Sequence, residues 1–300
     1  MTPADRKRLA ARAFSVDDEL RFPLTRAELK SIVAAALTED DARHDLTTAA
    51  MVLSDRRARC RMVAHQRGIV AGLPLAREAF RQVDRKVSIR TDRDDGSKVS
   101  PGTPLLFLTG HARNLLSAER VALNFVQRLS GIATLTARYV AAVRGTGAKI
   151  LDTRKTTPGW RKLERYAVRA GGGLNHRFNL SSAVLIKDNH LVSVDSDIAV
   201  AVKRARAIAP KKTVVEVECD RISQVEAALG AGADVIMLDN MKPAQLGRAV
   251  ALIDGRAVIE ASGGINLDTV RAIAETGVDW ISVGALTHSA PALDIGLDFD

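Results

Sequence analysis

The clearest chemical signal in this sequence is a run of cationic side chains between Arg154 and Lys187. This segment holds eight Lys or Arg residues against a single acid, Glu164. Several of the cations follow directly after short apolar runs, with Gly and Thr beside them. Arg grips a carboxylate through two parallel hydrogen bonds, whereas Lys acts as a mobile point charge. Cations fixed at the ends of buried strands suit a small polyanion, so the segment indicates an enzyme of phosphate and carboxylate chemistry.

Four of these cations sit where catalytic residues commonly sit. Arg154, Arg177 and Lys187 could together hold a ligand with more than one carboxylate. Lys155 could serve a different ligand group, because adjacent residues of a strand point in opposite directions. His176 could orient or protonate a ligand, although a lone histidine is as often structural. The other four cations have the spacing of an exposed helix face, and we expect them to be solvated: Arg161, Lys162, Arg165 and Arg169.

The elements that must position these residues follow a regular pattern from Lys149 onward. Near-continuous apolar strands alternate with helical segments, which indicates parallel βα units. The expected strands are 149–151, 183–186, 213–217, 235–238, 257–259 and 280–283, and the clearest helices are 193–209, 221–229 and 243–253. About six strands are too few for an eightfold barrel, so an incomplete barrel and an open wound sheet both fit.

Charged residues or glycines follow all six of these strands. In a parallel α/β fold the carboxyl ends of the strands share one face, where ligands bind. The residues concerned are Asp152 to Lys155, Lys187 to His190, Glu218 to Asp220, Asp239-Asn240, Ser262-Gly263-Gly264 and Gly284 to His288. We therefore predict a single binding site on this face.

Two acids and two glycine segments extend the chemistry of that face. Glu218 and Asp239 could bind hydroxyls or Mg²⁺, which usually takes one or two protein carboxylates together with substrate phosphates. The alternative is that each makes a structural ion pair with a neighbouring Lys or Arg. Ser262-Gly263-Gly264 and Gly284-Ala285 are typical of backbone phosphate cradles after late barrel strands.

The first part of the chain has a different pattern. A capping box at Thr25-Arg26-Ala27-Glu28 predicts a helix, and short strands and turns follow it. We expect an antiparallel sheet with helices on one face. A helical stretch over 113–144 leads into the second domain, with Gly131 as a break or a close contact. The predicted domains are a flexible lead-in over 1–20, an α+β sandwich over 21–130 with the tail 289–300 packed back on it, and an α/β barrel over 131–288.

Bulk composition excludes several classes of protein. The net charge is +9 and the pI is near 9.9, but only 4% of residues are aromatic and no nucleic-acid-binding motif appears, so nucleic-acid binding is disfavoured. Cys60 and Cys219 match no metal or redox spacing. No apolar run approaches the ~18 residues of a membrane span, and the first residues lack a secretory pattern. We expect a cytoplasmic protein that associates with no membrane.

Six segments of the chain, taken in order, closely resemble the quinolinate phosphoribosyltransferase family. They are Asp152 to Gly159, Asn175-His176-Arg177, Leu185 to His190, Glu216-Val217-Glu218 with Met237 to Asn240, Glu260 to Gly264, and Val283 to His288. The resemblance runs from about Leu37 to Leu297. It implies an N-terminal sandwich domain and an incomplete, about six- to seven-stranded α/β barrel. It also implies that quinolinate and phosphoribosyl pyrophosphate give nicotinate mononucleotide, pyrophosphate and carbon dioxide, in de novo NAD biosynthesis.

The same resemblance implies roles for particular residues. Arg154, His176, Arg177 and Lys187 would hold the dicarboxylate, and Arg120 would reach in from the other subunit of a homodimer. A higher oligomer is also compatible. Lys155, Glu218, Asp239, Ser262 to Gly264 and Gly284 would serve phosphoribosyl pyrophosphate, with Mg²⁺ on Glu218 and Asp239. Thr153 and Ala285 would also bind substrate.

Two other functions compete with this one. A related phosphoribosyltransferase could act on another ring, although a cluster of three cations favours a substrate with two carboxylates. A basic nucleic-acid-binding protein on a barrel scaffold would instead bind polynucleotides with a steep salt dependence and no turnover.

Overall fold

The computed structural model describes residue 14 and residues 19–300 of the chain. The predicted lead-in over 1–20 therefore lies almost entirely outside the described residues. The described residues form two compact units. The barrel unit contains Phe14, Arg138–Thr156 and Gly173–Ser289, and the sandwich unit contains Glu19–Ala137, Thr157–Gly172 and Ala290–Asp300. The predicted domains placed residues 157–172 in the barrel, whereas in the structure they group with the sandwich unit.

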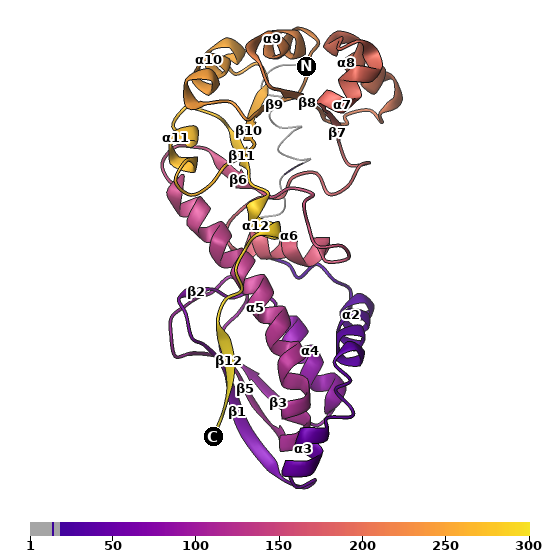
Figure 1. Ribbon diagram of the computed structural model, residues 1–300, viewed down its shortest axis with the longest axis vertical. Helices are drawn as coiled ribbons and strands as arrows, with labels where there is room; N and C mark the ends of the chain where they lie inside the picture. Colours follow the sequence, from indigo (N-terminus) through magenta and orange to yellow (C-terminus); the bar gives the residue numbers. More distant parts are fainter. Residues whose placement is uncertain (1–13, 15–18) are drawn as a thin grey trace. The chain divides into compact units, whose positions relative to one another are not determined.

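The sandwich unit is built on a four-stranded antiparallel sheet, as predicted from the sequence (Figure 1). Its strand order is β12-β1-β5-β3. The bounds are β1 Arg57–Ala64, β3 Ser88–Thr91, β5 Thr103–His111 and β12 Ile295–Phe299, and the short strands β2 (Gly68–Ile69) and β4 (Lys98–Val99) pair separately. Cys60, Met62 and Ala64 alternate along β1 and are all buried, so one face of the sheet belongs to the core.

Five helices belong wholly or mainly to the sandwich unit: α2 Arg26–Glu39, α3 Leu46–Met51, α4 Leu73–Val83, α5 Ala112–Ala142 and α6 Arg161–Ala170. The predicted capping box is present at the start of α2, where Thr25 and Glu28 each bond the other's main-chain N–H. Gly131 does not break α5. A Cβ at this position would collide with the carbonyl oxygen of Pro291, so Gly131 marks a close contact.

Helix α6 corrects the prediction of a solvated cationic face. Arg165 is only 9% exposed, and only one of the four helix cations, Lys162, is classed as exposed. The helix is buried on most sides: Glu164 accepts hydrogen bonds from Arg128 and Thr157. Regular spacing of charges on a helix therefore did not indicate exposure here, because α6 packs inside its unit.

The barrel unit holds a parallel six-stranded sheet with the order β6-β11-β10-β9-β8-β7. The strand bounds are β6 Lys149–Leu151, β7 Val184–Ile186, β8 Val215–Cys219, β9 Val235–Asp239, β10 Val258–Ser262 and β11 Trp280–Ser282. Strands β7 to β11 follow one another in one direction, and β6 then joins β11 rather than β7. This is the strand order of a barrel left open between β6 and β7, and not that of a doubly wound sheet.

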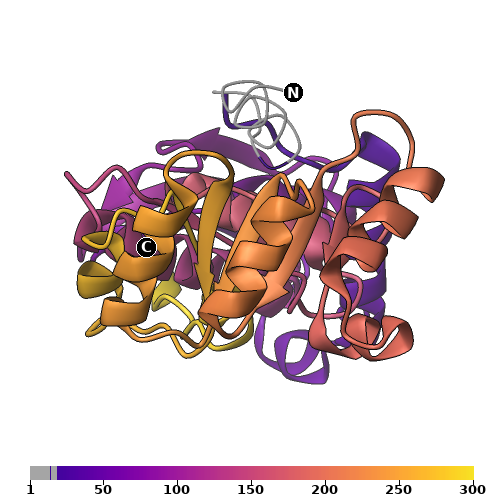
Figure 2. The ribbon, with the colours of Figure 1, turned by 90° about the horizontal axis from the view of Figure 1, so that it is seen from above.

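Helices cover the outer side of this sheet (Figures 1 and 2). The helices of the barrel unit are α7 Asp188–Leu191, α8 Ile198–Ile208, α9 Ile222–Gly230, α10 Pro243–Ile253, α11 Val270–Ala274 and α12 Ala285–His288, with a short 3₁₀ helix, η1, over Val192–Val194. No helix within the described residues has the length and apolar character needed to cross a membrane.

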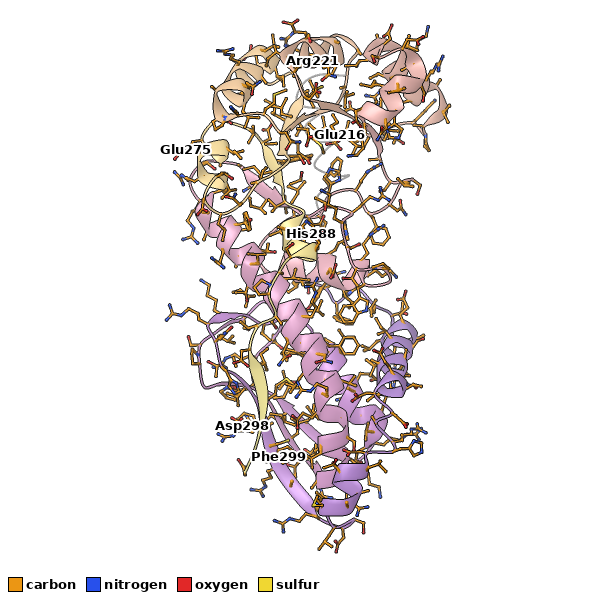
Figure 3. The ribbon with its side chains drawn as sticks, viewed as in Figure 1. Glu216, Arg221, Glu275, His288, Asp298 and Phe299 are labelled. Atoms are coloured by element: carbon orange, nitrogen blue, oxygen red, sulfur yellow. The ribbon has the colours of Figure 1, made fainter. Side chains whose placement is uncertain are left out.

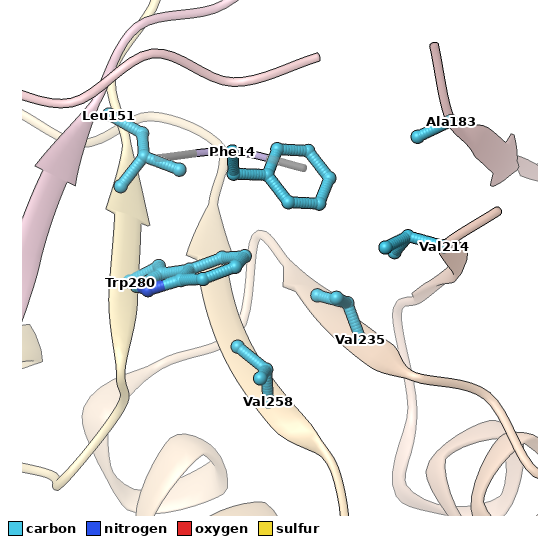
Figure 4. Close-up of a cluster of buried hydrophobic side chains, with 7 residues drawn as sticks. All are labelled: Phe14, Leu151, Ala183, Val214, Val235, Val258 and Trp280. Atoms are coloured by element: carbon cyan, nitrogen blue, oxygen red, sulfur yellow. The ribbon is translucent and has the colours of Figure 1, made fainter. Parts of the chain in front are cut away.

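The interior of the barrel unit is arranged in layers, because every second residue of a strand faces the same side. The deepest layer is apolar, and its members form one buried cluster (Figure 4): Phe14, Leu151, Ala183, Val214, Val235, Val258 and Trp280. Two residues further along three of these strands lie Glu216, Met237 and Glu260. Another two residues further, Glu218, Asp239 and Ser262 reach the carboxyl ends.

Candidate active site

A cavity of about 580 Å³ lies at the carboxyl ends of all six parallel strands. This volume is in the ordinary range of small-ligand sites. Its lining residues are Thr153, Arg154, Lys155, His176, Arg177, Leu185, Lys187, Glu218, Met237, Asp239, Asn240, Ser262, Gly263, Gly264 and Ser282. The residues predicted from strand ends far apart in the sequence are thus brought together around one space.

Three of the predicted site residues lie outside this lining. Gly284 is beside it, since a Cβ there would come 3.0 Å from Cδ of Lys155. Ala285 begins α12, and Thr287 of that helix donates a hydrogen bond to the carbonyl oxygen of Lys155 at 2.7 Å. Arg120 is an exposed residue of α5 in the sandwich unit.

The cations of the cavity are held in different ways. Arg177 is 6% exposed, and its Nη1 donates to the carbonyl oxygen of Ala183 at 2.9 Å. Burial and the nearby Arg154 guanidinium lower the pKa of Arg177, because both disfavour its charged form. Lys187 Nζ lies 2.7 Å from Glu218 Oε2. Two cations are therefore crowded together at one side of the cavity, and a third is balanced by an acid.

The two acids of the cavity differ in their partners. Glu218 has the ion pair with Lys187 that the sequence had left open as an alternative. Asp239 accepts a hydrogen bond from the side chain of Asn240 at 2.6 Å. The two carboxylates come from neighbouring strands and both reach the cavity. Two hard oxygen donors facing one space fit the preference of Mg²⁺ for few protein carboxylates plus substrate phosphates.

The glycine segment after β10 is shaped by its own packing. A Cβ on Gly263 would collide with the side-chain amide of Asn240, and Gly263 and Gly264 both have positive φ, at 89° and 60°. Glycine is therefore required at Gly263 by close packing as well as by backbone conformation. Helix α11 starts only at Val270, so its N-terminus does not follow this segment directly. Any anion here would be bound by loop N–H groups.

The segment carrying His176 and Arg177 is fixed to the end of β6 by a buried acid. Asp152 Oδ1 accepts from the main-chain N–H of His176 at 2.7 Å, and Oδ2 accepts from Asn175 Nδ2 at 2.6 Å. The Nδ1 atom of His176 in turn accepts from the main-chain N–H of Arg177 at 2.8 Å. By contrast, His190 caps α7 by accepting from the main-chain N–H of Lys187.

Sequence reasoning missed two buried acids beneath the cavity, Glu216 and Glu260. Both are completely buried, and each has an oxygen 3.4 Å from Nε2 of His176. In Figure 3 Glu216 lies among the strands, away from Arg221 on the outer side. Burial acts to lower the pKa of His176, but Glu260 and Glu216 outweigh it and raise this pKa to about 10. The sequence did contain a signal for these buried acids, because each lies in the middle of an apolar strand, as Glu216 does between Val215 and Val217.

Family comparisons cover nearly the whole described chain. Residues 45–130 match the quinolinate phosphoribosyl transferase N-terminal domain, and residues 132–298 match the C-terminal domain of the same family. Among similar proteins, a probable nicotinate-nucleotide pyrophosphorylase [carboxylating] from Bacillus subtilis is 43% identical, covering 90% of this chain and 93% of that protein. The enzyme of that name from Mycobacterium leprae is 46% identical over 85% and 90% of the two chains.

A solved structure agrees with these sequence matches. The nicotinate-nucleotide pyrophosphorylase from Francisella tularensis superposes with a TM-score of 0.88 at 37% identity, covering 95% of this chain and all of that one. The likeness therefore extends over both units of the fold.

Proposed function

Because this chain belongs to the quinolinate phosphoribosyltransferase family, we propose that its cavity joins quinolinate to the ribose of phosphoribosyl pyrophosphate and then releases carbon dioxide. The ring nitrogen of quinolinate attacks C1 of the ribose, and the bond from C1 to the pyrophosphate oxygen breaks. The carboxylate beside the now positive nitrogen leaves as carbon dioxide, and a proton replaces it. The products are nicotinate mononucleotide, pyrophosphate and carbon dioxide, in de novo NAD biosynthesis.

The observation that carries this assignment is the division of charge within the cavity. Arg154, Arg177 and Lys187 supply cations for the two carboxylates of quinolinate, and His176 lies beside them. Guanidinium groups suit carboxylates because two parallel N–H groups match two oxygens. Both ring nitrogens of His176 are turned toward protein groups, which favours an indirect role for this residue.

The other residues of the cavity suit phosphoribosyl pyrophosphate. They are Thr153, Lys155, Glu218, Asp239, Ser262, Gly263 and Gly264, with Gly284 close to Lys155 and Ala285 next to Gly284 in the chain. Glu218 and Asp239 would hold Mg²⁺ together with the substrate's phosphates, and the ion would neutralise charge on the leaving pyrophosphate. Loop N–H groups at the glycines and the ammonium of Lys155 would bind the remaining phosphate oxygens.

The chain's own residues then act by orientation and charge. No Ser or Cys with an adjacent base lines the cavity among the described residues, so no covalent enzyme intermediate is needed. The cations align the ring nitrogen with C1 of the ribose. This alignment lowers the entropic part of the activation free energy. Fixed charges also stabilise the changing charge of the ring during decarboxylation.

We further assign a homodimer in which Arg120 completes the site of the partner subunit. Arg113, Ser117 and Arg120 recur at helical spacing on one side of α5. Arg113 and Ser117 hold α3 against this side, through the carbonyl oxygens of Ala49 and Val52 and the carboxylate of Asp45.

Apolar side chains are exposed next to this anchored helix and next to the cavity. Leu46, Met51 and Leu53 are 83%, 79% and 75% exposed in the sandwich unit. Leu180 and Val192, at 71% and 74%, are exposed in the barrel unit near Arg177 and Lys187. Exposed apolar groups of this size favour burial against another protein surface. Two copies in an isologous dimer would cover both sets at once.

Both cysteines favour a reducing compartment. Cys60 and Cys219 are free and buried, and burial raises the pKa of each thiol to about 12. Such thiols are inert, which suits the cytoplasm, where we place the enzyme.

The direct test of the proposed function is release of carbon dioxide from carboxyl-labelled quinolinate. We expect release to require quinolinate, phosphoribosyl pyrophosphate and Mg²⁺ together. Nicotinate should not replace quinolinate. Consumption of nicotinate without consumption of quinolinate would show a related transferase instead.

The dimer has its own test, which uses two variants that each lack one cation of the site. Arg120→Ala and Arg177→Ala homodimers are each expected to show little activity at a quinolinate concentration near the wild-type KM. After mixing and reassembly, about a quarter of wild-type activity should return, since half of the dimers then contain one intact site. No recovery, with mixed dimers demonstrated by mass, would mean that Arg120 acts within its own subunit, and an active Arg120→Ala homodimer would mean that Arg120 has no role in the site.

A further inference from the structure

The cluster of His176, Glu216 and Glu260 forms a closed layer between the cavity and the apolar core. Glu216 projects from β8 and Glu260 from β10, one alternation below the cavity residues Glu218 and Ser262. Below the cluster, the Phe14 ring meets the His176 ring edge-on, with centroids 4.6 Å apart. All three members of the cluster are at most 5% exposed. These groups are therefore largely withdrawn from water, and they act on one another in a medium of low polarity.

The hydrogen bonds of His176 determine which nitrogen carries its proton. Nδ1 lies 2.8 Å from the main-chain nitrogen of Arg177, whose only hydrogen points at the ring, so Nδ1 must accept. The proton of the ring is then on Nε2, between the two carboxylates. A second proton on Nδ1 would replace this hydrogen bond with two donors facing each other. Glu260 and Glu216 favour a second ring proton and raise the pKa of His176 to about 10, but that proton would have to displace the main-chain N–H of Arg177 from Nδ1, and the folded chain holds this N–H in place at 2.8 Å.

This tautomer argues against a metal ion at the cluster, although its three donor atoms all lie within 4.8 Å of one another. A histidine that binds a metal through one nitrogen normally donates the hydrogen of the other to an acceptor. Here the other nitrogen is itself an acceptor, and a metal on Nε2 would require an anionic ring. The arrangement instead suits a histidine whose Nε2–H faces the two acids, each with an oxygen 3.4 Å from Nε2.

We propose that Glu216 and Glu260 are positioning residues that fix His176 so that its Nδ1 holds the backbone of Arg177, and with it the guanidinium that binds the carboxylates of quinolinate. This inference rests on the proposed function for its substrate. The chain of contacts is short. The two acids fix the orientation of the His176 ring, and the ring accepts the main-chain N–H of Arg177. The carbonyl oxygen of Ala183 then fixes the position of the guanidinium.

A spectroscopic test addresses the tautomer without any need for activity. In protein labelled with ¹⁵N in histidine, the ring nitrogens of His176, assigned by comparison with His176→Asn, should show an unprotonated Nδ1 and a protonated Nε2 at neutral pH. A doubly protonated ring, or a proton on Nδ1, would overturn the proposal. The proposal would also be overturned if the purified wild-type protein contained one metal ion per chain and the purified Glu216→Leu variant contained none.

A kinetic test separates positioning from folding. Replacing both acids together by apolar residues of similar size removes their own desolvation cost but leaves His176 without these partners, so the melting temperature of Glu216→Leu with Glu260→Leu is measured beside its kinetics. We expect quinolinate KM to rise about tenfold or more in this double variant, because His176 loses both acidic groups that lie 3.4 Å from its Nε2. The KM for phosphoribosyl pyrophosphate should stay within about twofold. The double Gln variant keeps an acceptor at each position and should recover most of the quinolinate affinity.

The matched control is Asp234→Asn, another fully buried acid of the barrel unit. Asp234 pairs with Arg206 and accepts from the main-chain N–H of Val215, and it does not line the cavity. Its replacement should lower the melting temperature and leave both KM values unchanged. If the double Leu variant instead raises both KM values equally, or lowers only the melting temperature, the acids serve stability and the positioning role is wrong. Absence of carbon dioxide release by the wild type would count against the proposed function. The ¹⁵N measurement would still test the tautomer of His176, because it does not depend on activity.

Discussion

Replacing Arg177 by Ala tests the dicarboxylate site most directly. The Arg177 side chain is 6% exposed, so a carboxylate that it binds is also withdrawn from water. Truncating one partner of a buried, hydrogen-bonded charge pair costs ~2–5 kcal/mol, because the other charge is left buried without its partner. The nearby Arg154 repels Arg177, and relief of this repulsion places the expected cost in the lower half of that range. With ~1.4 kcal/mol for each factor of ten, the dissociation constant of quinolinate is expected to rise about 30- to 300-fold.

The assay is a pair of KM measurements with carbon dioxide release as the readout. Quinolinate KM should rise by this factor, and the KM for phosphoribosyl pyrophosphate should change little. Folding should be retained, since Arg177 lines the cavity and the hydrogen bond that it donates to Ala183 is worth ~1 kcal/mol. Arg206→Ala is the matched control, because Arg206 also donates to main-chain carbonyl oxygens of the barrel unit but does not line the cavity. An Arg177→Ala protein that is folded and binds quinolinate normally would refute the assignment of the dicarboxylate to this side.

Three further predictions concern other parts of the chain. Asp239→Asn should raise the KM for phosphoribosyl pyrophosphate and the Mg²⁺ concentration needed for half-maximal rate, with quinolinate KM unchanged, as measured by magnesium titration. Glu164→Ala should lower unfolding free energy by about 3 kcal/mol in denaturant titration, because Arg128 loses its fully buried partner. Asp45→Ala should lower the melting temperature at neutral pH only. Hydrogen bonds from Thr48 lower the pKa of Asp45, so its stabilisation is present above the ordinary carboxyl pKa and disappears as the pH falls through the lowered one.

The strand ends were the part of the site that the sequence could predict. A parallel sheet aligns its carboxyl ends, so residues such as Lys187, Glu218 and Asp239 were expected to meet, and all three line the cavity. The helix predicted over Pro243–Ile253 has these bounds in the structure, since Pro at its first position fixes the start. Local chemistry determined both features, and no long-range information was needed.

Features that depend on long-range packing were harder to predict. The placement of α6 within the sandwich unit could not be read from its charges, because a helix between β6 and β7 is also what a barrel requires. Glu216 and Glu260 were passed over because they lie inside strands rather than at strand ends. Only the alternation of the two strands, followed residue by residue, places both of them in the layer beneath the cavity.

That layer explains how Arg177 stays charged in a site that contains a second guanidinium. Burial and Arg154 both lower the pKa of Arg177, whereas the carboxylate of Glu216 raises it. The apolar core around Phe14 and Trp280 offers no solvation from below. Burial and the neighbouring Glu260 raise the pKa of Glu216, which limits the negative charge under the cavity and its repulsion of a dicarboxylate. An active site gains from such an arrangement, because groups fixed before the substrate arrives need no reorganisation during the reaction.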